Sequence, residues 1–174
     1  MKKGALALAG LVMGIVVAVI WSRLAGRSMY TDVPMMQNAR LVEAETAWYA
    51  AGVSNYRILV SVEFSSEQRW NEITVTGGKV SAARVAVWDM QAGDMGAYVP
   101  LSTKEAEYFT VTGLFDLVRS ALQNEEVPRD EIRMSTSGTP AVPELIYLSE
   151  VIQDGEPVEG TALIVHVLQF EVLP

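Results

Sequence analysis

The chain has one histidine, His166, and proton-transfer chemistry of the usual kind would have to use it. A set of nucleophile, base and acid needs such a side chain as its base. His166 stands inside the apolar run 162–168, and no serine has a recognisable motif around it. We therefore interpret His166 as a core or half-buried histidine. The alternative, a catalytic base, can be tested by His166→Gln.

Paired carboxylates are the second group that could do chemistry. The closest pairs are Glu105/Glu107, Glu125/Glu126 and Asp130/Glu131. All three lie in polar stretches, where water solvates both charges and nothing prepares one carboxyl to act as an acid. The sequence therefore predicts solvated surface pairs, with Glu105 and Glu107 kept as the catalytic alternative.

The sequence contains few residues that could bind a metal or a cofactor. The chain has no cysteine, which excludes disulfides, thiolate chemistry and iron–sulfur ligation. One histidine leaves only carboxylates for zinc, and Asp89, Asp94 and Glu105 lack the spacing of a calcium loop. Phosphate-binding glycine loops and hydrolase or metalloprotease motifs are also absent. We predict no enzymatic activity, no cofactor and no metal.

The longest apolar stretch is residues 4–21, which contains no charge. As a helix it would span ~27 Å, close to the ~30 Å core of a bilayer. A cleaved signal peptide is the alternative, but bulky or charged residues follow where a cleavage site needs small ones. We expect a retained transmembrane signal-anchor over residues 1–27, in the cell inner (cytoplasmic) membrane. Gly10 and Gly14 form a small-xxx-small pattern, which predicts packing against another transmembrane subunit.

The charges on either side of this segment hardly favour one membrane orientation over the other. Lys2 and Lys3 precede it, and Arg23 and Arg27 follow it. The short amino terminus favours a cytoplasmic Met1 and a domain that faces the periplasm or cell exterior.

The rest of the chain is acidic. From Leu41 onward there are 20 acidic and 8 basic residues, a net charge of −12. Such a surface repels nucleic acid, so a nucleic-acid partner is excluded.

Periodicity predicts one α+β domain over residues 38–174, joined to the anchor by a tether over residues 28–37. Apolar residues at helical spacing indicate two helices, and strict alternation indicates strands. We expect an antiparallel sheet of about six strands with both helices on one face. The helices are expected over residues 38–51 and 112–124, and the strands over residues 55–64, 70–76, 79–88, 131–137, 144–151 and 161–172.

Residues 89–109 are predicted to be an irregular loop, which at this length is either functional or poorly ordered. Methionine adapts to irregular surfaces. The tether and this loop therefore supply the candidate partner contacts, which are Met35, Met36, Met90, Met95 and Tyr98. A second possibility is a pocket between sheet and helices, lined by residues such as Trp70, Trp88 or Tyr98.

An ordered set of short motifs resembles a small exported bacterial domain family of unknown function. The set is Trp48, Asn55-Tyr56-Arg57, the Gly77-Gly78 hairpin, residues 110–122 with Leu-Phe-Asp-Leu, residues 143–147 and a closing Gln169-Phe170-Glu171. Members of that family are often lipoproteins, and many carry a cysteine pair where this chain has Ser65-Ser66. The resemblance implies an exported domain and no activity.

Taken together, these features predict a non-catalytic, single-pass membrane-anchored accessory subunit of a larger membrane complex, such as a respiratory or photosynthetic one. Its partners would be the lipid bilayer and other transmembrane subunits. The alternative is a stand-alone envelope module that binds a small ligand or a peptide.

Overall fold

The computed structural model describes residues 30–65, 67–89 and 92–174. The chain divides into two compact units, Met1–Asp32 and Val33–Pro174, and every helix and strand named below belongs to the second unit. The predicted transmembrane segment, with Gly10 and Gly14, lies outside the described residues. Within them, no helix is long and apolar enough to cross a membrane.

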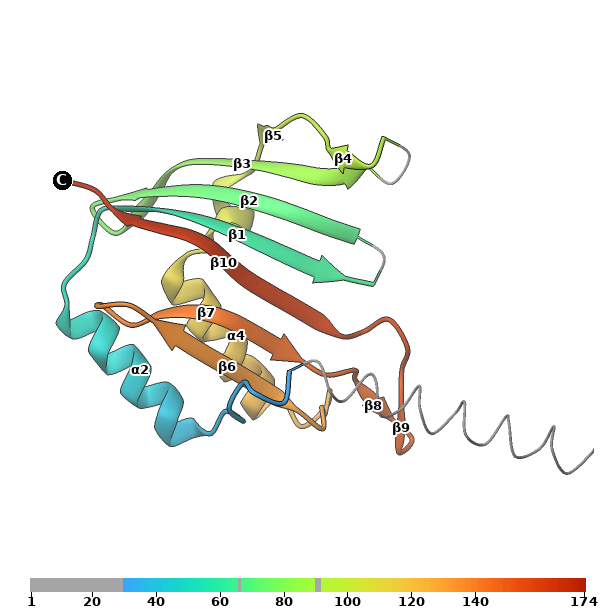
Figure 1. Ribbon diagram of the computed structural model, residues 1–174. Helices are drawn as coiled ribbons and strands as arrows, with labels where there is room; N and C mark the ends of the chain where they lie inside the picture. Colours follow the sequence, from blue (N-terminus) through green and yellow to red (C-terminus); the bar gives the residue numbers. More distant parts are fainter. Residues whose placement is uncertain (1–29, 66, 90–91) are drawn as a thin grey trace, which may run out of the picture. The chain divides into compact units, whose positions relative to one another are not determined.

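Six long strands and two long helices carry the fold, with several shorter elements between them (Figure 1). In chain order the elements are α2 (Asn38–Ala50), β1 (Tyr56–Phe64), β2 (Glu67–Thr76), β3 (Lys79–Asp89), β4 (Asp94–Met95), β5 (Val99–Pro100), α3 (Thr103–Glu107), α4 (Val111–Gln123), β6 (Ile132–Ser137), β7 (Val142–Leu148), β8 (Ile152–Gln153), β9 (Glu156–Pro157) and β10 (Leu163–Val172).

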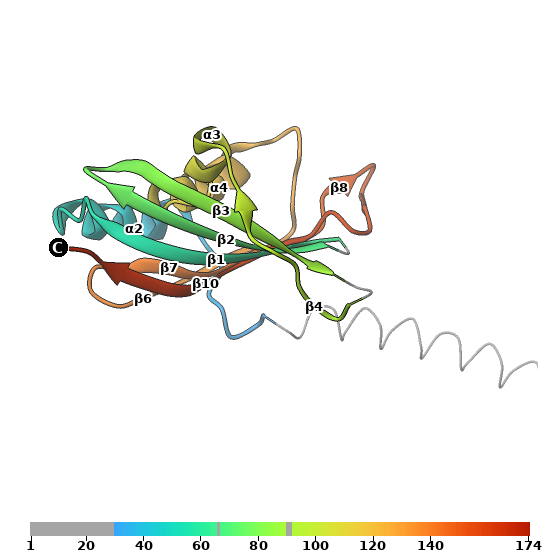
Figure 2. The same cartoon turned by 90° about the horizontal axis from the view of Figure 1, so that it is seen from above.

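The main sheet has eight strands in the order β4-β3-β2-β1-β10-β7-β6, with β5 also paired to β3. All its pairs are antiparallel. Two similar halves build it: α2 is followed by the meander β1-β2-β3, and α4 by β6, β7 and β10. We call these the first and second meander, and they join where β1 pairs with β10. α2, α3 and α4 lie on the same side of the sheet (Figure 2).

Local sequence explains the first meander. β1 alternates buried and more exposed side chains over most of its length, as a strand with one covered face must. Gly77 and Gly78, both at positive φ, form the two-residue turn between β2 and β3. A type I′ turn needs that conformation at both central positions, and glycine adopts it without a steric penalty.

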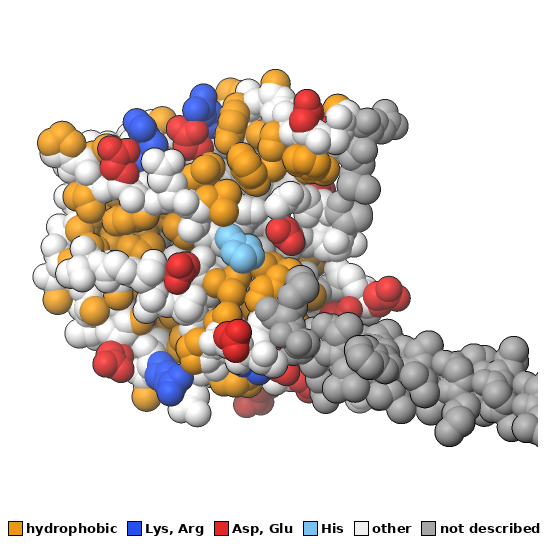
Figure 3. Space-filling model, in the orientation of Figure 1, with side chains coloured by type: hydrophobic (Ala, Val, Ile, Leu, Met, Phe, Trp, Pro, Cys, Tyr) orange, Lys and Arg blue, Asp and Glu red, His pale blue; other side chains and the backbone are white. Residues whose placement is uncertain are grey.

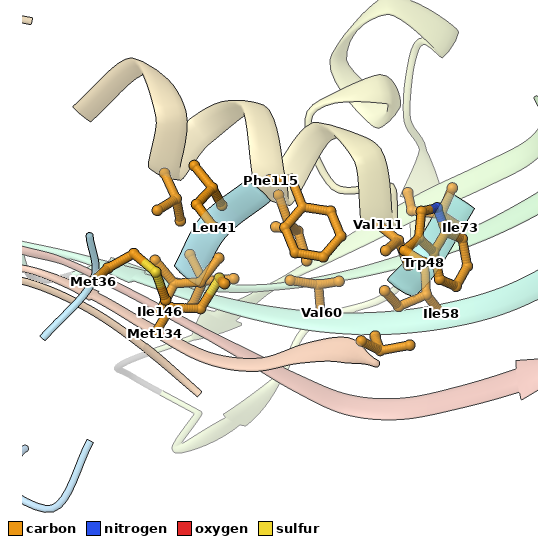
Figure 4. Packing of buried hydrophobic residues seen from close by; sticks show 14 of the residues in the cluster. Met36, Leu41, Trp48, Ile58, Val60, Ile73, Val111, Phe115, Met134 and Ile146 are labelled. Carbon is orange, nitrogen blue, oxygen red and sulfur yellow. The ribbon is translucent and has the colours of Figure 1, made fainter. Parts of the chain in front are cut away.

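The core lies between the sheet and the two long helices (Figure 4). Phe115 and Val118 of α4 and Leu41 of α2 are almost completely buried, as are Ile58 and Val60 of β1.

The start of α4 differs slightly from the sequence-based expectation. The helix has one strongly apolar side, and Thr110 caps its start by accepting a hydrogen bond from the Gly113 N–H at 3.1 Å. The sequence pattern favours Thr112 as the cap, so the helix begins a residue or two earlier than expected.

The predicted fold class is wrong in three respects. The main sheet has eight strands rather than six, a separate two-stranded sheet pairs β8 with β9, and there are three described helices rather than two. The predicted amino-terminal transmembrane helix is not shown either. Periodicity cannot predict two-residue strands such as β4 and β5, because an alternating pattern can be recognised only over several residues.

Residues 92–109 are also more ordered than expected. β4 and β5 pair with the outer edge of β3, and α3 follows with Ser102 as its cap. Ser102 donates to the Glu105 carboxylate while its Oγ accepts from the Glu105 N–H at 3.3 Å. A Ser-x-x-Glu sequence can signal a capping box, but here the Glu105 carboxylate accepts from the Ser102 hydroxyl rather than from the Ser102 backbone N–H.

Candidate functional site

We call the side of the sheet opposite the helices the open face. Strand register places one complete row of side chains across it: Ala86, Trp70, Ser61, His166, Leu145 and Ser135. These residues alternate with the helix-facing core residues on every strand. No helix of the described residues covers this side (Figure 2).

His166 lies in the middle of the open face and is half-buried (Figure 3). Ser61 is its direct cross-strand neighbour and is only 2% exposed. The Ser61 hydroxyl accepts from the Gln68 side-chain amide at 3.3 Å, and the same amide donates to Glu63 at 3.0 Å. Within the described residues, no hydrogen bond joins Ser61 to His166. This arrangement brings a serine, a histidine and a carboxylate near one another, but the serine is held by Gln68 and shielded from substrate.

The outer part of the open face carries an exposed cluster that we call the aromatic patch: Arg84, Trp88 and Tyr98. The Arg84 guanidinium lies over the Tyr98 ring, 4.5 Å from its centre, and also bonds Glu72 at 2.7 Å. Trp88 is 37% exposed and Tyr98 38% exposed. β4 and β5 hold these side chains in place, since both pair with β3 next to them.

Trp70 lies beside the patch, next to Ala86. Its indole N–H is buried and has no hydrogen-bond partner among the described residues. An orphaned buried donor costs about 1–3 kcal/mol, so this part of the sheet is not optimised for stability.

The methionines predicted to contact a partner differ in how far they are exposed. Met36 is buried and its N–H donates to the Ile132 carbonyl at 2.8 Å, so it extends the sheet beyond β6. Met35 forms a bridge with Arg133 but leaves its side chain 41% exposed. Met95 is half-buried opposite Trp88. Met90 lies outside the described residues.

Two cavities are candidates for a binding site. One, which we call the helix-side cavity, has a volume of about 660 Å³ and lies between α3, α4 and the sheet. Apolar side chains such as Val62, Leu117 and Leu163 line it. Trp70, Trp88 and Tyr98 share the open face, but they line neither this cavity nor the other one. The predicted pocket between sheet and helices therefore has different walls from those expected.

The remaining candidates are separate from one another. Glu105 bonds the Ser102 cap of α3, whereas Glu107 lines the helix-side cavity. Glu125 and Glu126 are exposed in the loop after α4. In the part of the chain that the structure describes, no group of three or more potential metal ligands comes together.

Sequence reasoning missed Arg84 and the Ser61–Gln68–Glu63 chain of hydrogen bonds. Alternation along β1, β2 and β3 assigns these residues to one side of the sheet, but only the cross-strand register makes them neighbours. No protein-family model matches the chain, and no curated protein gives a significant match. The resemblance to an exported bacterial domain family therefore stays a prediction.

Proposed function

We propose that this protein is a non-catalytic accessory subunit that binds a partner protein through the open face of its sheet. The observation that supports this best is the aromatic patch. Trp, Tyr and Arg are the residue types that most often dominate binding energy in protein interfaces. Here all three are exposed together on a rigid sheet.

The partner is a protein surface with lysine or arginine at its rim. The domain from Leu41 onward carries a net charge of −12, which favours encounter with a basic surface and disfavours an acidic one. The patch itself is locally neutralised, because Arg84 is paired with Glu72. A neutral aromatic centre on an acidic domain fits an interface in which the centre contributes most of the binding energy. The charges around it would then raise the rate of association with a basic partner.

The chain offers a matched control for testing this proposal. Tyr49 and Tyr108 are each 64% exposed, and they lie on α2 and just after α3 rather than on the open face. We compare the double variant Trp88→Ser/Tyr98→Ser with the double variant Tyr49→Ser/Tyr108→Ser. Both remove two exposed aromatic rings and differ in the face that they change; the control also removes the Tyr108 ring from the lining of the helix-side cavity.

The measurement is native electrophoresis of gently extracted material from the source cells. The wild type and the control should migrate far above 19.0 kDa, and the patch variant should migrate as the free chain. A wild type that migrates as a monomer contradicts the proposal. So does a patch variant that stays in the assembly. The membrane location predicted for this assembly stays a prediction.

A second candidate function rests on the helix-side cavity. Its volume of about 660 Å³ is in the range of small-molecule sites, and its apolar walls suit an apolar ligand. Lys104, Glu107 and Asp116 also line it and would orient a polar end. This is the ligand-binding alternative, with the site between sheet and helices.

An apolar fluorescent probe, 1-anilinonaphthalene-8-sulfonate, tests the second candidate. Saturable binding at one site should be lost in Val62→Phe, which fills the cavity. It should be unchanged in Val42→Phe, a change on the exposed side of α2. Equal binding by both variants would show that the probe does not occupy this cavity.

A further inference from the structure

The main sheet is incomplete in its interior. β10 runs from Leu163 to Val172 and pairs with β1 along its whole length, but it pairs with β7 only from Leu163 to His166. Beyond His166 the two strands diverge, and the hairpin of β6 and β7 turns away from β10 (Figure 1). We call the space between them the split.

The backbone of β10 presents unpaired groups to the split. The Leu173 N–H donates to the Asn55 carbonyl at 3.0 Å, which fixes the hydrogen-bonding phase of the β1–β10 ladder. Along an antiparallel strand, the backbone N–H and C=O groups of one residue bond the strand on one side, and those of the next residue point to the other side. Phe170 and Val172 therefore direct their N–H and C=O groups away from β1. Within the described residues, β7 supplies no partner for them.

Specific residues cause the divergence. β7 carries Pro143, which has no N–H to offer to a neighbouring strand. The β1–β10 register shifts between Leu59 and Val60, where Leu168 is the extra residue, and the β6–β7 register shifts between Ser135 and Thr136. Each bulge bends its strand. Residues on both sides of the split, in the β6–β7 hairpin and in β10, therefore cause the two strands to separate.

A cavity of about 510 Å³ occupies the split. The turn after β6 forms one wall and the second half of β10 the other, and Glu144 is the charged side chain in the lining. Leu168 is 48% exposed and Val172 53% exposed on the β10 side. The site therefore combines a free strand edge, exposed apolar side chains and a negative charge.

We infer that the split binds an extended, basic peptide segment of a partner protein, which adds to β10 as a further strand. Only another polypeptide strand matches donors and acceptors that alternate with the period of a β-strand. The negative charge of Glu144 and of the whole domain selects lysine or arginine on the incoming segment. This site is separate from the aromatic patch and does not depend on it.

A second copy of the chain fits the split poorly. Since β10 lies inside its own sheet, the second copy would have to insert an outer strand, but Met35 bridges Arg133 at the β6 edge. At the opposite edge, β4 and β5 occupy β3. A flexible segment of a different protein meets neither obstacle.

The experiment uses the full chain and a labelled synthetic peptide, acetyl-Lys-Val-Lys-Val-Lys-Val-amide, in a fluorescence anisotropy titration. Two peptide controls accompany it: the same sequence N-methylated at alternate residues, and the sequence with Glu in place of Lys. Loss of two backbone hydrogen bonds weakens binding about tenfold. We expect at least that loss for the N-methylated peptide, and a weaker interaction for the acidic one. Equal binding by the N-methylated peptide overturns strand addition.

Val172→Pro is the matching protein variant. It removes the outward N–H, and its ring is tolerated because that N–H has no partner within the sheet and the site is half exposed. Val172→Ala is the control, since it keeps the N–H and removes apolar area. We expect about threefold weaker binding for Val172→Pro at an unchanged Tm, because one hydrogen bond is lost rather than two, and a smaller loss for Val172→Ala.

Amide hydrogen exchange locates the bound peptide. The Phe170 and Val172 amides should become protected when the peptide binds, while amides of β3 stay as they were. Protection along β3 instead overturns the proposed location. Protection that grows with protein concentration and without peptide overturns the proposed partner, because it would show a second copy in the split.

Discussion

The two meanders have the same order of elements and differ in how completely their strands pair. β1 and β2 pair from Tyr56–Val75 to Phe64–Glu67 without interruption, and β2 and β3 pair along almost their full length. In the second meander, β7 leaves β10 after His166. The difference teaches that one layout allows two outcomes: the first meander pairs its strands almost throughout, and the second leaves backbone groups of β10 unpaired, where we propose that a peptide binds.

The largest expected effect comes from the core under the two meanders. Ile58 in β1 is completely buried, and Ile58→Ala should cost about 2–5 kcal/mol of unfolding free energy. Val142 in β7 is 4% exposed beside the split, and Val142→Ala should cost less, about 2 kcal/mol, because fewer groups are lost. Urea denaturation measures both. Equal costs would mean that the second meander is as tightly packed as the first.

The next effect concerns the ion pair that joins the two helices. Arg119 of α4 bonds Glu45 of α2, and this hydrogen bond is the main cause that raises the pKa of Arg119. The Glu45 side chain is only 11% exposed, so Arg119→Met would leave its charge poorly solvated. We expect a loss of about 1–2 kcal/mol, discounted because Arg119 itself is partly exposed. Restoration of stability by the second change Glu45→Met would confirm the coupling.

Alkaline pH should reveal a buried tyrosine in the first meander. Burial raises the pKa of Tyr56, although the Val111 N–H, which donates to its hydroxyl oxygen at 3.3 Å, opposes the shift. A raised pKa means that the unfolded chain loses this proton first, so stability is complete below about pH 10 and falls as pH rises further. Thermal unfolding from pH 7 to 11 measures the fall. Tyr56→Phe should flatten it, whereas a slope unchanged by this substitution would exclude Tyr56 as the cause.

The smallest effect is a helix cap. Thr110 caps α4 with its side chain, whereas Gln37 at the start of α2 makes no such bond. Gln37→Asp should stabilise the fold by about 0.5–1 kcal/mol, because aspartate is a strong cap and also interacts favourably with the helix dipole. Gln37→Ala is the control and should be nearly neutral. A shift in Tm of the same size for both variants would count against capping.

Long, strongly periodic segments were within reach of sequence reasoning, and short or long-range features were not. Alternation places the carboxyl end of β1 at Phe64 and its start within one residue of Tyr56, and the Gly77-Gly78 turn follows from its residue types. The pairing of β1 with β10 joins residues as distant as Tyr56 and Val172, and nothing local signals it. The aromatic patch and the split both depend on strand pairing and register, so they appear only in the folded chain.

The central position of β10 has a consequence for how the protein is made. β1 is synthesised before β2, which lies on one side of it, but its other neighbour, β10, is synthesised only after β2 to β9. Until then the growing chain exposes an unpaired edge with large apolar side chains beside it, a state prone to aggregation. The completed sheet therefore depends on late, long-range contacts, which are the slow kind to form. A nascent chain stalled before residue 163 should need a chaperone to stay soluble, whereas a chain that includes β10 should not.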